Sequence, residues 1–344
     1  MLLSDIGEFG LIRRIAGLLP ASRDDVVVGI GDDVAVLRTS ASEYLLATCD
    51  IQIENVHFFR DNITPYQLGK KVVAINVSDI AAMGGAPAWA LASLALPRDI
   101  EVTFVDELYR GMREQMAEAG ASIVGGNLSK IREEILIDFF LLGKVVPDQM
   151  TLRSGARRGD LIFVTGTLGD SRAGLELIRR PELPVSGQGR GHVMKRHFTP
   201  RPRLREGQAL ARSGLVHAMA DVSDGLVGDL SHICRASRVG AEIRLTGVPV
   251  SRECEEVAHA AGQDASDWAL TGGEDYELLF TADSESASEI RIILENETGT
   301  ACHAIGRIVD EAAGIGMVLV DGERVSFSSG SMSWDHFGGS SMSR

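Results

Sequence analysis

The segment that most constrains this chain is residues 74–87, which run AINVSDIAAMGGAP. A run of apolar, mostly β-branched residues leads up to Ser78 and Asp79, and it predicts a strand that ends at this pair. Ser and Asp favour helix N-caps because their side-chain oxygens accept backbone N–H bonds. The Ala-rich turn that follows ends at Gly84, Gly85 and Pro87, which predicts a short helix there. Capping alone does not explain a carboxylate among Ala, Met and Gly, where a cation or ligand can approach closely.

Composition excludes several classes of function. The formal charge of −14 argues against binding to nucleic acid or to an anionic membrane, and 5% aromatic residues argue against a stacking surface for bases. An acidic protein still binds nucleotides when divalent metals stand between carboxylate and phosphate. The four cysteines form no CxxC pair, which predicts reduced thiols in a cytoplasmic protein without a zinc site. The N-terminus lacks the features of a signal peptide, and residues 135–146 are too short to span a bilayer.

The length of 344 residues predicts two domains. We place the boundary near residue 150, where Pro and Gly interrupt the sequence. The expected parts are an N-terminal domain over 1–150, a C-terminal domain over 151–337 and a disordered tail over 338–344. Apolar spacing predicts helices at 8–19, 65–73, 104–119, 171–180 and 284–297, a helix ending near 237, and strands at 26–30, 34–37, 44–48, 91–96, 135–146, 161–165, 241–245 and 278–281. Residues 186–191 are expected to form a Gly-rich loop, and 195–205 a basic turn.

Five junctions share one arrangement: an apolar run, then a carboxylate or amide, then glycine or the start of a helix. They lie at 31–33, 48–50, 78–79, 125–127 and 221–225. In open α/β sheets, ligands bind just beyond the carboxyl ends of strands. Carboxylates gathered there repel one another unless a cation neutralises them, and oxygen donors without a His or Cys cluster favour Mg²⁺ over zinc. The junctions therefore predict a metal–nucleotide site, since Mg²⁺ held by carboxylates bridges to substrate phosphates.

The common mononucleotide motifs are missing from the sequence. It contains no GxxxxGK[ST] motif, no HRD or DFG kinase motifs, and no GxGxxG after the first predicted strand. Phosphate binding must therefore use another architecture.

Eight segments, spread in order over nearly the whole chain, match one family. They are GEFGLI (7–12), GIGDDVAVL (29–37), Asp50 with ENVHF (54–58), NVSDIAAMGGAPAW (76–89), VTGTLGDS (164–171), DVSDGLVGDL (221–230), GGEDYELLFT (272–281) and DHF (335–337). In these segments the chain resembles the thiamine-monophosphate kinases, a family of the aminoimidazole-ribonucleotide synthetase-like ATP-binding superfamily. The resemblance implies an α/β protein with an α+β N-terminal domain and an α/β C-terminal domain. It also implies a homodimer in which N-terminal strands pair, with ATP and metals between the domains.

The resemblance further implies Mg²⁺-dependent, direct in-line transfer of the ATP γ-phosphoryl group to thiamine monophosphate. The implied Mg²⁺ ligands are Asp33, Thr48, Asp50, Asp79, Asp221 and Asp224, of which Asp33, Asp50, Asp79 and Asp224 are the expected catalytic carboxylates. The implied nucleotide contacts are Gly126, Asn127, Arg153 and Ser223, and the implied thiamine-phosphate contacts are His57 and Glu274. The acceptor is already an anionic phosphate, so we expect no general base.

Taken without the family, several of these residues have plainer explanations. Arg153 suits phosphate recognition but equally a solvated loop, beside Arg157 and Arg158. His57 fits a half-buried structural histidine, and Glu274 fits a turn cap after two glycines.

The sequence departs from the family pattern at three places. Asn127 replaces an aspartate, which predicts fewer or weaker metals, and Cys49 precedes Asp50 where the family has threonine. No aromatic cleanly matches the one that the family places on the thiazole, because Ser331 has the corresponding spacing and Trp334 is the nearest aromatic.

Two other functions stay open at this point. One is a sister ATP-dependent activity of the superfamily, which a substrate panel would distinguish. The other is a non-catalytic nucleotide-binding protein, which Asn127 suggests.

Overall fold

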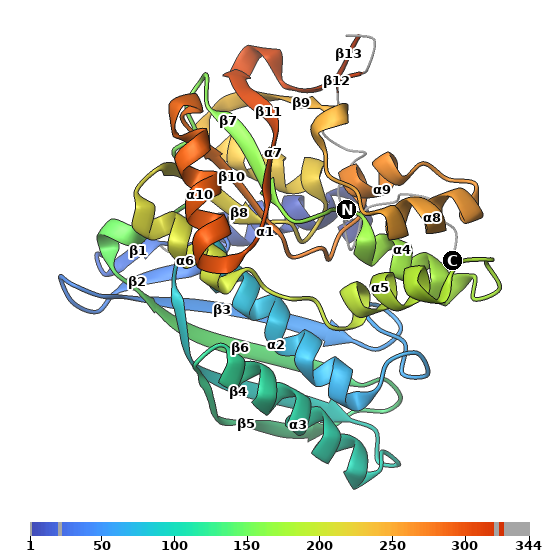
Figure 1. Cartoon of the computed structure of the whole chain (residues 1–344). Coiled ribbons are helices and arrows are strands. Elements are labelled where there is room, and N and C mark those ends of the chain that lie inside the picture. The colour runs from blue at the N-terminus through green and yellow to red at the C-terminus, as the bar shows by residue number, and fades with distance from the viewer. Residues whose placement is uncertain (1, 20–22, 320–322, 327–344) are drawn as a thin grey trace.

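Two β-sheets, one in each half of the chain, form the framework of the computed structural model, which describes residues 2–19, 23–319 and 323–326. Figure 1 shows the sheet of the first half below and that of the second half above. The expected tail over 338–344, the DHF segment, Ser331 and Trp334 all lie outside the described residues. Within the described residues, every helix is too short or too polar to cross a membrane.

The first sheet has the strand order β1-β2-β3-β6-β4-β5, and all neighbours are antiparallel except β4 and β5. Its strands are β1 (Val26–Val28), β2 (Ala35–Arg38), β3 (Tyr44–Ile53), β4 (Ala86–Leu96), β5 (Ser122–Lys130) and β6 (Leu136–Val145). Burial alternates along β6, so one face of the sheet is covered and the other is open. The predicted strands at 26–30, 34–37, 44–48, 91–96 and 135–146 are confirmed, with shifted ends.

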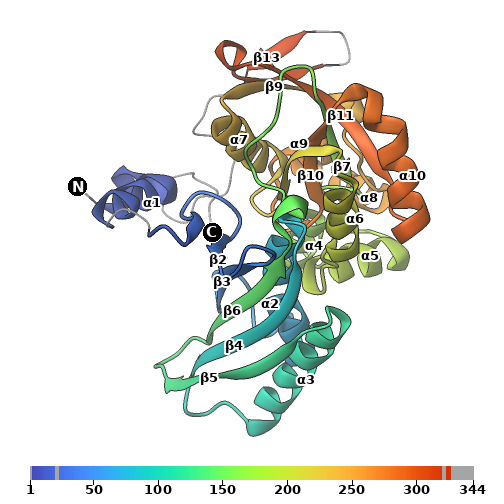
Figure 2. The same ribbon diagram turned by 90° about the vertical axis from the view of Figure 1, so that its left-hand side faces the viewer.

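Two helices, α2 (Pro65–Ala82) and α3 (Val102–Glu118), cover one face of this sheet, as Figure 2 shows. They pack closely because glycine stands at their crossing: a Cβ on Gly69 would lie 2.0 Å from the Leu108 carbonyl oxygen, and one on Gly111 would lie 2.0 Å from the Tyr66 carbonyl oxygen. The short helix α1 (Gly7–Leu18) confirms the helix predicted at 8–19 and lies beside the open side of the domain (Figure 2).

The strand predicted to end at Ser78-Asp79 is wrong. Residues 72–79 belong to α2, which starts at the N-cap Thr64, whose hydroxyl accepts from the backbone N–H of Gln67. The β-branched run misled the prediction because α2 is buried on nearly every side, and a helix that is apolar all round lacks the period that distinguishes it from a buried strand. Asp79 therefore lies in the last turn of a helix rather than at its N-cap.

The second sheet has the order β13-β12-β9-β11-β7-β10-β8 and is antiparallel except between β12 and β9. Its strands are β7 (Leu161–Thr165), β8 (Val216–Asp221), β9 (Val239–Arg244), β10 (Leu278–Ala282), β11 (Cys302–Asp310), β12 (Ile315–Val318) and β13 (Arg324–Ser326). Its helices are α4 (Asp170–Arg179), α5 (Gly187–Phe198), α6 (Leu204–Ser213), α7 (Leu226–Ser237), α8 (Arg252–Ala261), α9 (Ala265–Thr271) and α10 (Ala287–Thr298). Apolar side chains pack on both faces, with α7 on one and α6 and α10 on the other.

The Gly-rich loop predicted over 186–191 is wrong, because these residues lie at the start of α5, and the basic turn predicted over 195–205 is confirmed only for residues 199–203, between α5 and α6. Ser186 caps the helix by accepting from the backbone N–H of Gly189. Glycine disfavours an isolated helix, yet α5 contains Gly187, Gly189 and Gly191, and it packs against α4. A Cβ on Gly174 of α4 would lie 2.6 Å from the Val193 carbonyl oxygen of α5.

Candidate active site

Three aspartates from distant parts of the chain meet where the two halves of the molecule join. Asp33 precedes β2, Asp79 lies in the last turn of α2, and Asp221 ends β8. Each offers a carboxylate oxygen, and these oxygens all lie within 4.8 Å of one another. Both halves of the chain therefore contribute to one acidic centre.

Arg153 is the cation that contacts this centre. Its Nε lies 3.0 Å and its terminal nitrogen 2.5 Å from Oδ1 of Asp33, and its backbone N–H donates to the carboxylate of Asp32. The other oxygen of Asp33, Oδ2, is buried and has no hydrogen-bond partner. A buried carboxylate oxygen without a donor is costly, and this one lies in the centre that Asp79 and Asp221 share.

Hydroxyl groups orient the other two carboxylates. Thr48 Oγ1 donates to Oδ2 of Asp79 at 2.6 Å, and Ser78 Oγ donates to Oδ2 of Asp221 at 2.6 Å. The second bond joins α2 of the first half to β8 of the second half. Asp79 and Asp221 are thus held in place by side chains that leave their other oxygen atoms available.

The single guanidinium of Arg153 does not balance the negative charge of the carboxylates gathered at the centre. Burial is the largest cause that raises the pKa of Asp221 to about 8, and the carboxylate of Asp33 adds to it. Burial, followed by the charges of Asp50 and Asp221, holds the pKa of Asp79 well above its usual value. The C-terminal position of Asp79 in α2 is also unfavourable for a negative charge. Burial and the neighbouring Asp224 raise the pKa of Asp50 to about 6, so these groups ionise together only if a cation joins them.

A second acidic group lies beside the first at the start of α7. Asp224, Asp229 and His232 each offer a donor atom within 4.8 Å of the others. The carboxylate of Asp229 accepts from the backbone N–H groups of Ser223 and Asp224, and it thereby fixes the turn that carries both predicted site residues. Our sequence analysis missed Asp229 and His232. Their i, i+3 spacing on a helix, just after the predicted Asp224, could have revealed them.

The predicted thiamine-phosphate contacts lie close to each other. Glu274 forms an ion pair with Lys71 at 2.8 Å, and the charges of Lys71, His197 and His57 lower its pKa despite its burial. The Nδ1 atom of His57 accepts from the backbone N–H of Ile53, which fixes the ring at the end of β3. Lys71 was not among the predicted residues.

Gly126 and Asn127 lie apart from the acidic centre within the described chain. Both belong to the exposed edge strand β5, where Asn127 pairs with Ser93 of β4. Ser93 pairs in turn with Asp138 of β6, and Asp138 with Ile51 of β3. Asn127 is therefore about three strand spacings, roughly 14 Å, from the strand that carries Asp50. The assignment of Gly126 and Asn127 to the nucleotide stays a prediction.

Three of the junctions predicted at strand ends lie elsewhere in the fold, although Thr48, Asp50 and Asp79 do lie at the site. Thr48 and Asp50 lie within β3, Asn127 lies within β5, and Asp79 is helical. Both sheets are mainly antiparallel, so the rule for the carboxyl ends of parallel strands does not apply. The alternation along β3 places Cys49, which is exposed, on the face opposite Thr48 and Asp50.

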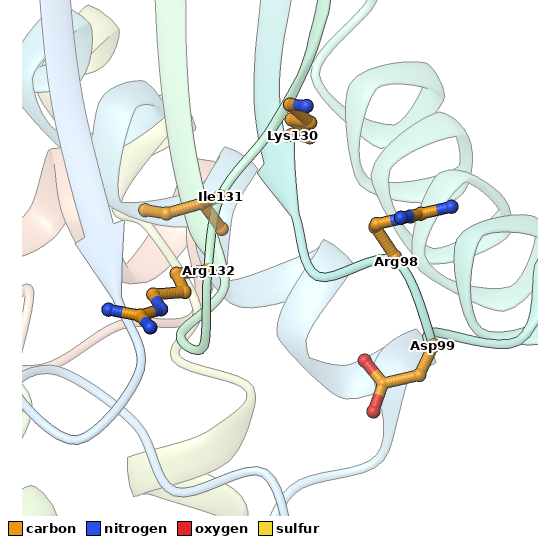
Figure 3. Close-up of a pocket in the computed structure, with 5 residues that line it drawn as sticks. All are labelled: Arg98, Asp99, Lys130, Ile131 and Arg132. Atoms are coloured by element: carbon orange, nitrogen blue, oxygen red, sulfur yellow. The ribbon is translucent and has the colours of Figure 1, made fainter.

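A surface pocket of about 400 Å³ lies at the far end of the first sheet. Its lining comes from the loops after β4 and β5, and in Figure 3 the side chains of Arg98 and Arg132 point away from each other. It contains none of the predicted site residues, and we assign it no role.

Comparison with known proteins agrees with this geometry. Residues 31–145 match the family described as AIR synthase related protein, N-terminal domain, and residues 157–318 match its C-terminal domain. A thiamine-monophosphate kinase of Aquifex aeolicus is 39% identical over 98% of this chain and 100% of its own length. That of Escherichia coli K12 is 35% identical over 96% of this chain and 98% of its own length.

A solved structure described as "AaThiL complexed with AMPPCP and TMP" superposes with a TM-score of 0.84 at 37% identity, covering 98% of this chain and 99% of the other. The matched region covers nearly the whole of both chains and therefore spans both sheets. The chain therefore belongs to the thiamine-monophosphate kinase family.

Proposed function

We propose that this protein transfers the γ-phosphoryl group of ATP directly to thiamine monophosphate, giving thiamine diphosphate and ADP. Its relatives are thiamine-monophosphate kinases, and a similar structure is described with AMPPCP and TMP. The observation that carries the proposal is the convergence of Asp33, Asp79 and Asp221 from both halves of the chain. Such a centre suits phosphoryl transfer, which depends mainly on positioning and on neutralising charge.

The residues present fit Mg²⁺. The donors are all oxygen atoms, and the buried Oδ2 of Asp33 has no partner. We assign the metal to Asp33, Asp79 and Asp221, with Asp50, Asp224 and the hydroxyl of Thr48 completing the predicted ligand set. When bound, the metal would neutralise charge on the phosphates and on the carboxylates together.

The chain's own groups divide the remaining work. The guanidinium of Arg153 is largely buried and held by Asp33, so it presents a fixed positive charge to a nucleotide phosphate. Ser223 lies in the turn that Asp229 fixes, and it supplies a nucleotide contact. His57 and Glu274 bind the thiamine end. The nucleophile is the terminal phosphate oxygen of thiamine monophosphate, which needs no side chain to remove a proton.

We also propose that the protein is a cytoplasmic homodimer in which strands of the first sheet pair across the two subunits and its open face is covered. Exposed apolar side chains on this face include Ile51, Trp89 and Leu91, each about two-fifths exposed. Leu91→Lys is expected to give monomers in sedimentation equilibrium, whereas unchanged dimers would reject this face. The cytoplasmic assignment rests on four free cysteines. The domain division near residue 150 stays a proposal, and residues 1–150 share the Mg²⁺ and ATP site with Arg153, Asp221 and Asp224 of the second part.

The experiment is a coupled assay with the purified chain, ATP, MgCl₂ and thiamine monophosphate. ADP and thiamine diphosphate should appear in equal amounts, and EDTA should stop the reaction. ATP consumption with a different acceptor in a substrate panel would instead indicate a sister activity. If the wild type binds ATP without turnover, and Asn127→Asp restores turnover, the protein is a non-catalytic nucleotide-binding protein.

A further inference from the structure

Lys71 is a fully buried charged residue that the proposed mechanism does not use. It lies in the middle of α2, and only 1% of its side chain is exposed. Its Nζ lies 2.8 Å from Oε1 of Glu274, which belongs to the other half of the chain. Burying an ammonium group costs several kcal/mol unless a counter-charge meets it, so this pair links the two halves at a fixed position.

The backbone of Glu274 has an unfavourable conformation, so a fixed partner for its side chain helps to hold it. Its φ of 65° is in the left-handed region, which non-glycine residues seldom adopt. Its backbone N–H donates to the carbonyl of Ser223 at 2.8 Å, so the loop that carries Glu274 is tied to the turn that carries Asp224. The side chain of Glu274 keeps 28% of its surface exposed, so it is not wholly enclosed by the protein.

The second oxygen of Glu274 faces a neutral neighbour. The Nδ1 atom of His197 lies 3.5 Å from Oε2 of Glu274 and 2.9 Å from the hydroxyl of Ser171. Burial, and next the charge of Lys71, lower the pKa of His197 to about 4, so the ring is uncharged near neutral pH. Lys71 therefore supplies the positive charge that holds Glu274 ionised, while Oε2 keeps acceptor capacity.

The same helix also positions the metal side of the site. Lys71 and Ser78 are seven residues apart on α2, which is two helical turns, so they share one face. Ser78 donates to Asp221, and Lys71 holds Glu274. One rigid helix face thus sets the spacing between the acidic centre and the thiamine end.

We infer that Lys71 is a positioning residue for thiamine recognition: it fixes one oxygen of Glu274 so that the other can accept from the aminopyrimidine of the substrate. This inference rests on the proposed function.

The test compares Lys71→Met with Lys70→Met. Lys70 is the matched control, since it lies next to Lys71 on α2 but pairs with the exposed Glu118. For Lys71→Met, the KM for thiamine monophosphate should rise about 10- to 100-fold, as expected when a charged hydrogen bond is lost. KM for ATP and kcat should change by less than about threefold, because the interaction serves substrate binding in both the ground and transition states. Lys71→Arg should restore part of the affinity.

A double-mutant cycle separates positioning from general stability. Lys71→Met/Glu274→Gln should bind thiamine monophosphate as weakly as Glu274→Gln alone, because Lys71 acts through Glu274. The double variant also removes both buried charges, so it is expected to fold even if Lys71→Met does not. Additive losses in the cycle, or an unchanged KM for thiamine monophosphate in Lys71→Met, would overturn the inference.

Calorimetric titration with thiamine monophosphate distinguishes the two proposals. If the wild type binds thiamine monophosphate without turnover, the proposed kinase activity is rejected, but the double-mutant cycle can still be measured as binding. If the wild type neither binds nor phosphorylates thiamine monophosphate, both the proposed function and the role of Lys71 are rejected.

Discussion

Asp221→Asn should stabilise the metal-free protein while it abolishes metal-dependent activity. Asparagine keeps an oxygen that can accept from Ser78 but removes one negative charge from the centre. Two unit charges 4.8 Å apart repel by about 3 kcal/mol at an effective dielectric constant of about 20. Burial of the Asp221 carboxylate and the charge of Asp33 both add to this gain, and Arg153 reduces it.

The gain in stability of the metal-free Asp221→Asn variant should grow as pH rises. The pKa of Asp221 is raised to about 8 in the folded state, above the ordinary value that applies when the chain is unfolded. Folding of the wild type is therefore favoured while this carboxyl is protonated, and that stability is lost as pH rises toward and through about 8. Asp221→Asn cannot lose stability in this way, so the free energies of unfolding of the two proteins should differ little near pH 4 and most above pH 8.

The assay is thermal unfolding in EDTA and in MgCl₂. At pH 8.5 in EDTA, Tm of Asp221→Asn should exceed that of the wild type by about 6–12 °C, since a domain of about 150–250 residues shifts by about 2–4 °C per kcal/mol. Added Mg²⁺ should raise Tm of the wild type and have little effect on the variant. The exposed Asp310→Asn serves as the control. A lower Tm for Asp221→Asn in EDTA, or an equal response of both proteins to Mg²⁺, would refute this reasoning.

Three further substitutions test other contacts. Glu277→Gln should destabilise the protein by about 3–5 kcal/mol, because buried Arg196 and Arg203 would lose their shared carboxylate, and urea unfolding measures this; a loss below 1 kcal/mol would contradict it. Thr48→Val removes the hydroxyl that orients Asp79, so a Mg²⁺ titration of activity should shift to several-fold higher concentration, with a stability change of only about 1 kcal/mol. Cys49→Ser should leave the same titration unchanged, because Cys49 lies on the opposite face of β3; an altered Mg²⁺ requirement would show that this face reaches the metal.

Residue chemistry was more predictable from the sequence than local structure. Asp33, Asp79 and Asp221 were predicted from the junction pattern and from the family resemblance, and these three do meet. The helix α2 was mistaken for a strand, since its burial on nearly every side removes the amphipathic period. The helix α5 was mistaken for a loop, since it contains three glycines, which disfavour a helix, and its packing against α4 and α8 cannot be seen in the segment alone.

The sequence by itself determined which chemistry is available: many acidic oxygens, no metal-binding Cys or His cluster, and segments shared in order with one family. Only the tertiary structure decided which of these groups act together. The pair of Lys71 and Glu274 joins residues more than 200 positions apart, as the numbering shows, and no local pattern encodes it. The same holds for Ser78 with Asp221 and for Arg153 with Asp33. Such contacts form because a helix of the first half packs against strands and loops of the second, and that packing depends on the whole buried surface rather than on any one segment.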